Sequence, residues 1–241
     1  YPPGGEMPDP YRKMMDPYLS LMTAANATTT LRLGTGIALL MERDLFSQAK
    51  TIATLDHLSG GRLMIGTGVG WNREEFENAS PHPFDKRYAV LRETVEATRA
   101  LWRDEEASYH GDYLRFDPVW ADPKPLQPGG PKIFLGAMGP LGRRHAARWA
   151  DGWYPVDVAM GDVGETLAVF RDEVREAGRD PDTVEINIQI MDTANLDKLK
   201  EYRDLGVQRA TIGVSMDLWD QPDAVMPMID KYAGVIPDLA G

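Results

Sequence analysis

The chain has 241 residues, of which 43% are hydrophobic and 26% charged, a composition typical of a globular protein rather than of a disordered or fibrous one. Its formal net charge is −11, and an acidic protein repels nucleic-acid phosphates and anionic membrane surfaces, so we expect neither as a partner. No apolar run approaches the roughly 20 residues that a membrane-spanning helix needs. Cysteine is absent, which excludes disulfides, thiolate nucleophiles and cysteine-ligated metals and suits a cytoplasmic protein.

Histidine is the other common side-chain ligand of transition metals. The four histidines are His57, His82, His110 and His145, and no two of them are four residues apart, the spacing that places two imidazoles on one helix face. The sequence therefore predicts no metal site.

The regular elements begin after a proline-rich start, with a helix expected over about 18–27. Beyond it, short runs rich in β-branched residues alternate with longer segments whose apolar residues recur every three or four positions. The predicted strands are 31–37, 62–66, 132–136, 152–156, 184–190 and 209–214. The predicted helical stripes are 45–55, 90–102, 163–174, 196–205 and 225–232. Such alternation predicts βαβ units around a parallel sheet.

No low-complexity tract or linker divides the chain, so we expect a single α/β domain over 1–241, for which a barrel of about 250 residues would fit. One insert interrupts the alternation at about 107–131 and carries five prolines and four aromatic residues. Such an insert either folds over the active-site face or forms a packed surface excursion with a short β-ribbon, and the sequence leaves both open.

Glycines mark three of the predicted strand ends, at 34–36, 66–70 and 136–139. In an α/β barrel the loops at these ends build the ligand site, and glycine lets the backbone approach a flat ring or a phosphate closely. A helix that starts beyond such a loop offers free N–H donors to an anion. We therefore expect one cofactor cleft shared by the three loops.

The loop at 66–70 also contains half of the glycine fingerprint of nicotinamide-binding proteins. The third glycine is not at its expected place, and no acidic residue follows at the distance that binds the ribose. A doubly wound nicotinamide-binding domain is therefore disfavoured.

A longer stretch around this loop resembles a family signature. Residues 53–71, ATLDHLSGGRLMIGTGVGW, with EEF at 74–76, are similar to the signature of the luciferase-like monooxygenase superfamily. The segments 123–125, 133–136 and 143–153 extend the resemblance, which spans about 19–232. The likeness is greatest to the branch that uses coenzyme F420, a 5-deazaflavin, although FMN-dependent relatives share much of the signature.

The resemblance implies a (β/α)8 TIM barrel of the bacterial-luciferase type, with the deazaflavin or flavin across the carboxyl ends of its strands. In such enzymes the loop after the third strand backs the ring and often carries a non-prolyl cis peptide, which here would join Gly36 and Ile37. The residues implied in cofactor binding are Thr35, Gly36 and Ile37 behind the ring, Gly68, Val69 and Gly70 at its edge, Ala137, Met138 and Gly139 at its phosphate, and Arg143 at the acidic tail of F420.

The catalytic candidates follow from the chemistry that the resemblance implies. A reduced deazaflavin gives up a hydride and does not readily activate oxygen, so the protein has to position a substrate and manage a proton. One branch of the family has an acid directly after the glycine loop, where this chain has Trp71. Trp71 and Glu74 are therefore the catalytic candidates, with Glu75 as an alternative acid and His82 as a possible substrate contact.

The family alignment also concerns the start of the chain. It matches the first predicted strand to the third strand of the family barrel, so we expect the first two βα units, about 50 residues, to lie before Tyr1. The chain would then be a fragment or lack its N-terminal part in this sequence. A genuine six-stranded variant is the alternative, but it would leave an open edge on a buried parallel sheet.

Two charged residues of the signature have a structural interpretation. Asp56 and Arg62 flank the turn at 59–61, and their opposite charges favour an ion pair. We expect them to hold the turn rather than to act on a substrate.

Three functions remain open at this point. The leading one is an F420-dependent oxidoreductase that transfers a hydride to or from a small organic substrate. The second is an FMN-dependent monooxygenase that uses reduced flavin and oxygen. The third is a non-catalytic barrel, which either binds flavin or deazaflavin or is degenerate. The resemblance implies a homodimer, and the sequence does not reveal which small molecule is the substrate.

Overall fold

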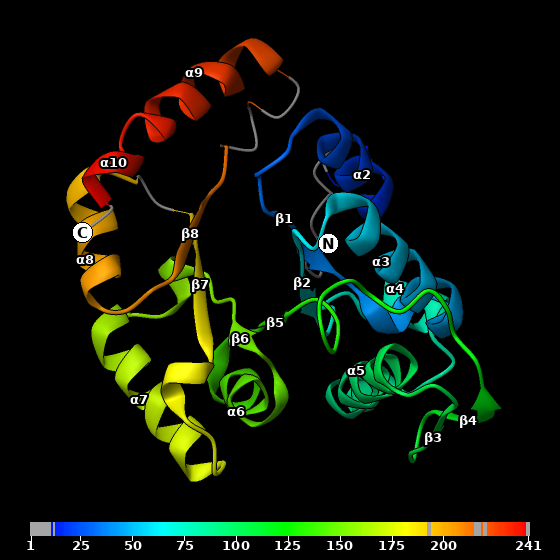
Figure 1. Ribbon diagram of the computed structural model, residues 1–241. Helices are drawn as coiled ribbons and strands as arrows, with labels where there is room; N and C mark the ends of the chain where they lie inside the picture. The colour runs from blue at the N-terminus through cyan, green and yellow to red at the C-terminus, as the bar shows by residue number, and fades with distance from the viewer. Residues whose placement is uncertain (1–10, 12, 192–193, 215–217, 219–220, 240–241) are drawn as a thin grey trace. The chain divides into compact units, whose positions relative to one another are not determined.

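The computed structural model describes residues 11, 13–191, 194–214, 218 and 221–239 (Figure 1). The chain divides into two compact units. The first unit consists of 15–137 and 149–151, and the second is built mainly from 138–148 and 152–241. No helix in the described part of the chain is long and apolar enough to cross a membrane.

The first unit contains three parallel strands, β1 (Leu33–Ala38), β2 (Leu63–Gly68) and β5 (Ile133–Gly136). Strand β2 lies in the middle, and its Ile65 pairs with Thr35 on one side and with Ile133 on the other. The side chains of Ile65 and Ile133 are completely buried, because parallel strands are covered on both faces and so consist of continuous apolar residues.

Three helices of the first unit begin at a residue whose side chain caps the first turn. The helices of this unit are α2 (Pro17–Ala27), α3 (Leu45–Ser59), α4 (Arg73–Ala79) and α5 (Arg87–Arg103), with 3-10 turns η1 (Leu40–Glu42) and η2 (Phe84–Lys86). Helix α3 starts at Asp44, whose carboxylate accepts the N–H of Ser47, and ends at Gly60, where φ is 72° and a side chain would be strained. Helices α2 and α3 lie side by side (Figure 1).

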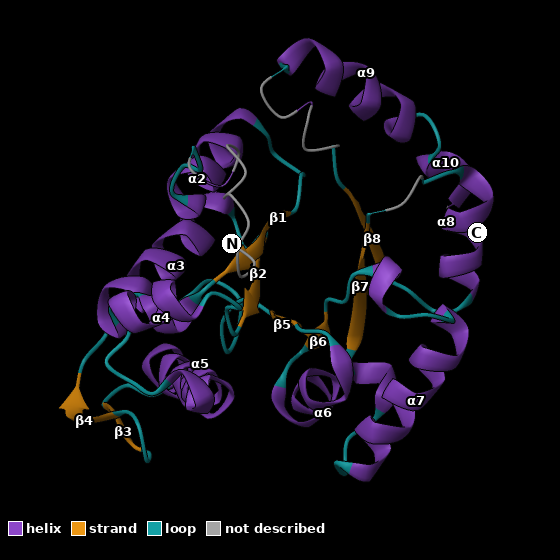
Figure 2. Cartoon of the chain, turned by 180° about the vertical axis from the view of Figure 1, so that it is seen from behind, coloured by secondary structure: helices purple, strands orange, loops and turns teal. Residues whose placement is uncertain are grey.

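The insert at about 107–131 contains a two-stranded antiparallel ribbon, β3 (Ala107–His110) and β4 (Arg115–Val119), which lies beside α5 (Figure 2). Glu93 of α5 is 2% exposed and accepts three backbone N–H groups, from Asp112, Tyr113 and Leu114, at 3.1, 2.8 and 3.1 Å. The short β-ribbon, part of one of the two interpretations that the sequence left open, is confirmed.

The second unit has its own three parallel strands, β6 (Gly152–Trp153), β7 (Glu185–Ile190) and β8 (Arg209–Ile212), with β7 in the middle. Its helices are α6 (Gly139–Trp149), α7 (Val163–Glu176), α8 (Leu196–Asp204), α9 (Pro222–Ala233) and α10 (Ile236–Leu239), with 3-10 turns η3 (Asp157–Ala159) and η4 (Pro181–Thr183). The buried Asp157 joins the loops after β6 and β7, accepting from Met191 N–H at 2.9 Å and from Lys198 Nζ at 2.8 Å.

All six predicted strands are present, and the α/β class with parallel strands is confirmed. Strand β6 ends at Trp153, earlier than expected, because Pro155 has no N–H to donate to a neighbouring strand. The single domain over 1–241 and the two βα units before Tyr1 stay predictions.

The expected ion pair between Asp56 and Arg62 is wrong. Asp56 is fully buried and accepts instead from the backbone N–H and the Nε2 of Gln127, at 2.9 and 2.7 Å. Arg62 donates to the carbonyls of Ala25 and Thr28 at the end of α2. Both residues are structural, as predicted, but each has a partner that is distant in sequence.

Candidate cofactor site

The three glycine-rich strand ends of the first unit lie on neighbouring parallel strands. Because β1, β2 and β5 run in the same direction, their carboxyl ends meet at one edge of the sheet. The peptide bond between Gly36 and Ile37 is cis, which confirms the prediction from the resemblance. This edge of the first unit is the candidate cofactor site.

Ile37 lies across the ends of the two neighbouring strands. A Cβ atom added to Gly68 would overlap the Cδ1 of Ile37, and one added to Gly136 would lie 2.9 Å from its Cγ2. Both positions therefore have to be glycine for Ile37 to keep its place. Since 42% of Ile37 is exposed, it forms an apolar platform over three strand ends, which we call the Ile37 platform (Ile37, Gly68 and Gly136).

Two buried threonines connect the strands beneath this platform. The Oγ1 of Thr35 donates to the carbonyl of Gly66 at 2.7 Å, and the Oγ1 of Thr67 donates to the carbonyl of Ala38 at 2.9 Å. The side chain of Thr35 therefore holds β1 against β2. Gly36 is exposed next to Ile37, and Val69 is 9% exposed in the loop that follows β2.

Glu42, at the end of η1, is a site residue that sequence reasoning missed. Its Oε1 is buried and has no hydrogen-bond partner among the described residues. A Cβ atom on Gly70, where φ is +69°, would lie 3.2 Å from that oxygen. Burial and, to a lesser extent, the charge of Glu75 raise the pKa of Glu42 to about 7. The signal in the sequence was an acid at the end of an apolar run directly after the first glycine strand.

The two catalytic candidates follow the loop after β2. Trp71 is 55% exposed, and Glu74 is exposed in the first turn of α4, where its backbone carbonyl accepts from Asn78 Nδ2 at 2.7 Å. His82 packs edge-on against the ring of Tyr113, with 5.8 Å between centroids. The catalytic roles of Trp71 and Glu74 stay predictions.

The predicted phosphate-binding residues lie where α6 begins. Ala137 is buried, Met138 is 45% exposed, and Gly139 is the first residue of α6, with a φ of +72°. In the second unit, Arg143 forms a bidentate ion pair with Glu173, at 2.8 and 3.1 Å, in which the two side chains are 18% and 13% exposed. An acidic cofactor tail would have to compete with Glu173 for Arg143, and its role at the cofactor stays a prediction.

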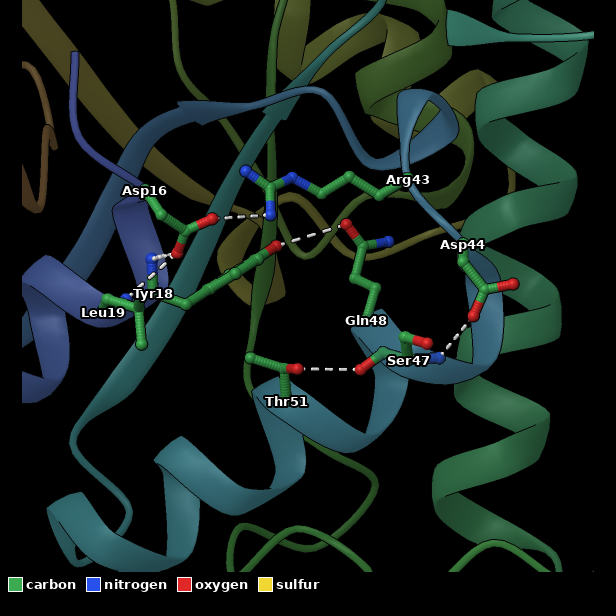
Figure 3. Close-up of a pocket in the computed structure, with 8 residues that line it drawn as sticks. All are labelled: Asp16, Tyr18, Leu19, Arg43, Asp44, Ser47, Gln48 and Thr51. Atoms are coloured by element: carbon green, nitrogen blue, oxygen red, sulfur yellow. Dashed lines mark hydrogen bonds and ion pairs between the residues drawn. The ribbon is translucent and has the colours of Figure 1, made fainter.

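A pocket of about 400 Å³ lies between the starts of α2 and α3 and is lined mostly by polar residues (Figure 3). Arg43 and Asp16 point toward each other across it, 2.8 Å apart, and the Tyr18 hydroxyl donates to Gln48 Oε1 at 3.3 Å. Asp44 accepts the N–H of Ser47 at 2.8 Å, and burial raises the pKa of Tyr18. These mutual bonds hold the two helix starts together, and none of the predicted cofactor residues lines the pocket.

Comparison with known proteins shows the family. The family model described as luciferase-like monooxygenase matches residues 5–209. An uncharacterised protein of Mycobacterium tuberculosis is 41% identical over 86% of this chain and 72% of its own length. The F420-dependent hydroxymycolic acid dehydrogenase of the same organism is 30% identical over 88% of this chain and 57% of its own. An FMNH2-dependent dimethylsulfone monooxygenase of Pseudomonas putida is 35% identical over 53% of this chain and 34% of its own.

Solved structures of the same family have similar folds. The monooxygenase RslO1 of Streptomyces bottropensis matches with a TM-score of 0.65 and 32% identity, over 79% of this chain and 59% of that one. An F420-dependent secondary alcohol dehydrogenase matches with a TM-score of 0.71 over 85% and 81%, and at 19% identity it shows the fold alone. These neighbours are luciferase-like TIM-barrel proteins, as the fold class predicted. The chain belongs to the luciferase-like monooxygenase family of oxidoreductases.

Proposed function

We propose that the chain belongs to an F420-dependent oxidoreductase that moves a hydride between the deazaflavin and a small organic molecule. The observation that carries the proposal is the 30% identity, along 88% of the chain, to an enzyme named as F420-dependent. The chain spans 57% of that enzyme, so the activity proposed is that of the whole protein.

The Ile37 platform fits a flat ring. Gly36, Gly68 and Gly136 present no side chains there, and Ile37 supplies an apolar surface that is open on one side. A planar tricyclic ring could stack on this surface without moving the backbone, and Val69 and Gly70 would line its edge. The residues present therefore fit a deazaflavin or a flavin.

A bound reduced deazaflavin supplies a hydride, and the protein supplies position and solvent exclusion. Ile37 would shield one face of the ring from water. Thr35 and Thr67 fix the strand ends that carry the platform, through their bonds to the Gly66 and Ala38 carbonyls. The opposite face of the ring is left for the substrate.

An FMN-dependent monooxygenase is the second candidate. It is favoured by the 35% identity over 130 residues to an FMNH2-dependent enzyme. FMN has the same planar shape and also carries a phosphate, so the platform would accept it equally well. The two candidates differ in which cofactor the protein binds.

Fluorescence titration of the purified protein with F420 and with FMN tests the proposal. We expect F420 to bind and FMN to bind at least tenfold more weakly. Ile37→Ala should weaken F420 binding about tenfold, because it removes apolar contact worth more than 1 kcal/mol. Leu31→Ala, at a leucine that is 54% exposed, is the matched control and should leave binding unchanged. Tight binding of FMN alone would favour the monooxygenase, and binding of neither would favour a non-catalytic barrel.

A further inference from the structure

Glu42 closes the 3-10 turn that follows β1, five residues beyond the cis peptide. Its Oε1 is buried without a hydrogen-bond partner in the described part of the chain. A buried carboxylate oxygen without a donor is costly, so such a group favours its neutral form or an external partner. No described residue around the Ile37 platform donates a hydrogen bond to this oxygen.

The carboxyl lies against the backbone of the glycine loop. The position of a Cβ atom on Gly70 is 3.2 Å from Glu42 Oε1 and 3.7 Å from the nearest Leu39 methyl carbon. A larger residue at Gly70 would press on this oxygen, and its φ of +69° adds strain for any side chain. Glycine thus keeps the carboxyl in contact with the loop that is predicted to line the ring edge.

The charges around Glu42 favour the neutral acid. Burial is the larger cause of its raised pKa, and Glu75 of α4 adds a like charge. Arg43, the next residue, is turned away toward Asp16, at 2.8 Å, and lies over the ring of Tyr18 (Figure 3). The cationic residue next to Glu42 in the sequence is therefore paired with another carboxylate.

We propose that Glu42 is a ligand-facing residue of this site that binds an anionic deazaflavin as a neutral acid. Its carboxyl O–H donates a hydrogen bond to an oxygen of the ligand, and its ionised form repels the ligand. The inference rests on the proposed function, since it takes F420 as the ligand. It makes cofactor binding depend on pH near neutrality, with the protonated protein as the binding form.

The test compares the pH dependence of F420 binding in the wild type and in Glu42→Gln, since glutamine is neutral at every pH and retains a hydrogen-bond donor. The wild-type dissociation constant should rise about tenfold between pH 6 and pH 8 relative to that of Glu42→Gln. Titration of the free protein with 13C-labelled glutamate should show one carboxyl near pH 7 that is missing from Glu42→Gln. In Glu75→Gln the same carboxyl should titrate at a lower pH.

Three results would overturn the inference. Parallel pH profiles in the two proteins, with F420 bound in both, would show that Glu42 does not face the ligand while the proposed function stands. If the Glu42 carboxyl titrated at the usual pH of a glutamate, it would be ionised near neutral pH and could not bind the ligand as a neutral acid. Absence of F420 binding at both pH values would overturn the proposed function, and this inference with it.

Discussion

Glu42→Gln should change how the stability of the protein depends on pH. The pKa of Glu42 is raised from 4.5 to about 7 in the folded protein. In the unfolded chain the carboxyl returns to water and ionises near 4.5, so between these values the unfolded chain binds fewer protons. The free energy of unfolding of the wild type therefore falls as pH rises from about 4.5 to about 7, and this contribution is constant above.

The size of this loss of stability follows from the width of the pH interval between the two pKa values. Each pH unit contributes at most 1.36 kcal/mol, so the interval corresponds to about 3 kcal/mol. Glu42 is half-buried, and water screens part of its charge, so we expect a loss of about 1 to 3 kcal/mol. In a protein of this size each kcal/mol shifts the melting temperature by about 2–4 °C.

Urea unfolding of both proteins at pH 5 and pH 8 measures the effect. Relative to Glu42→Gln, the wild type should lose stability at pH 8. Glu105→Gln, which changes an exposed acid of the same unit, should follow the wild type at both pH values. An unchanged difference between wild type and Glu42→Gln across this range would refute the assigned burial of the carboxyl.

Two further variants test other parts of the structure. Glu93→Ala removes the acceptor of the three N–H groups at 112–114 and should lower the free energy of unfolding, measured with urea, by about 3–5 kcal/mol. The control Glu105→Ala should lower it by less than about 0.5 kcal/mol. A loss below about 1 kcal/mol for Glu93→Ala would show that other contacts hold the ribbon. Arg143→Gln should cost about 2–4 kcal/mol, because Glu173 is left mostly buried without its partner. A loss of F420 affinity without a loss of stability in Arg143→Gln would instead support its predicted place at the cofactor tail.

The elements were predictable because their signals are local. Strand β2 is a short buried run, strand β7 alternates isoleucines with polar residues, and the helices between the strands carry apolar stripes at helical spacing. The cis peptide between Gly36 and Ile37 came from the family resemblance rather than from the physics of the segment. The early end of β6 depends on the single residue Pro155.

The contacts that sequence reasoning missed join residues that are distant in the chain. Asp56 bonds to Gln127, 71 positions away, so a nearby arginine was the wrong partner to expect. The buried Oε1 of Glu42 lies close to Gly70, which belongs to the loop after a different strand, β2. Neither contact can be predicted from the charges of residues that are close together in the sequence. Both contacts exist only once the chain has folded and brought the distant segments together.

Hydrogen–deuterium exchange with and without F420 tests the central claim, that the cofactor binds at the Ile37 platform. We expect slower amide exchange on binding at 36–42 and 66–71, where the platform and the glycine loop lie. Slower exchange confined to 16–20 and 46–51, around the pocket of Figure 3, would contradict it.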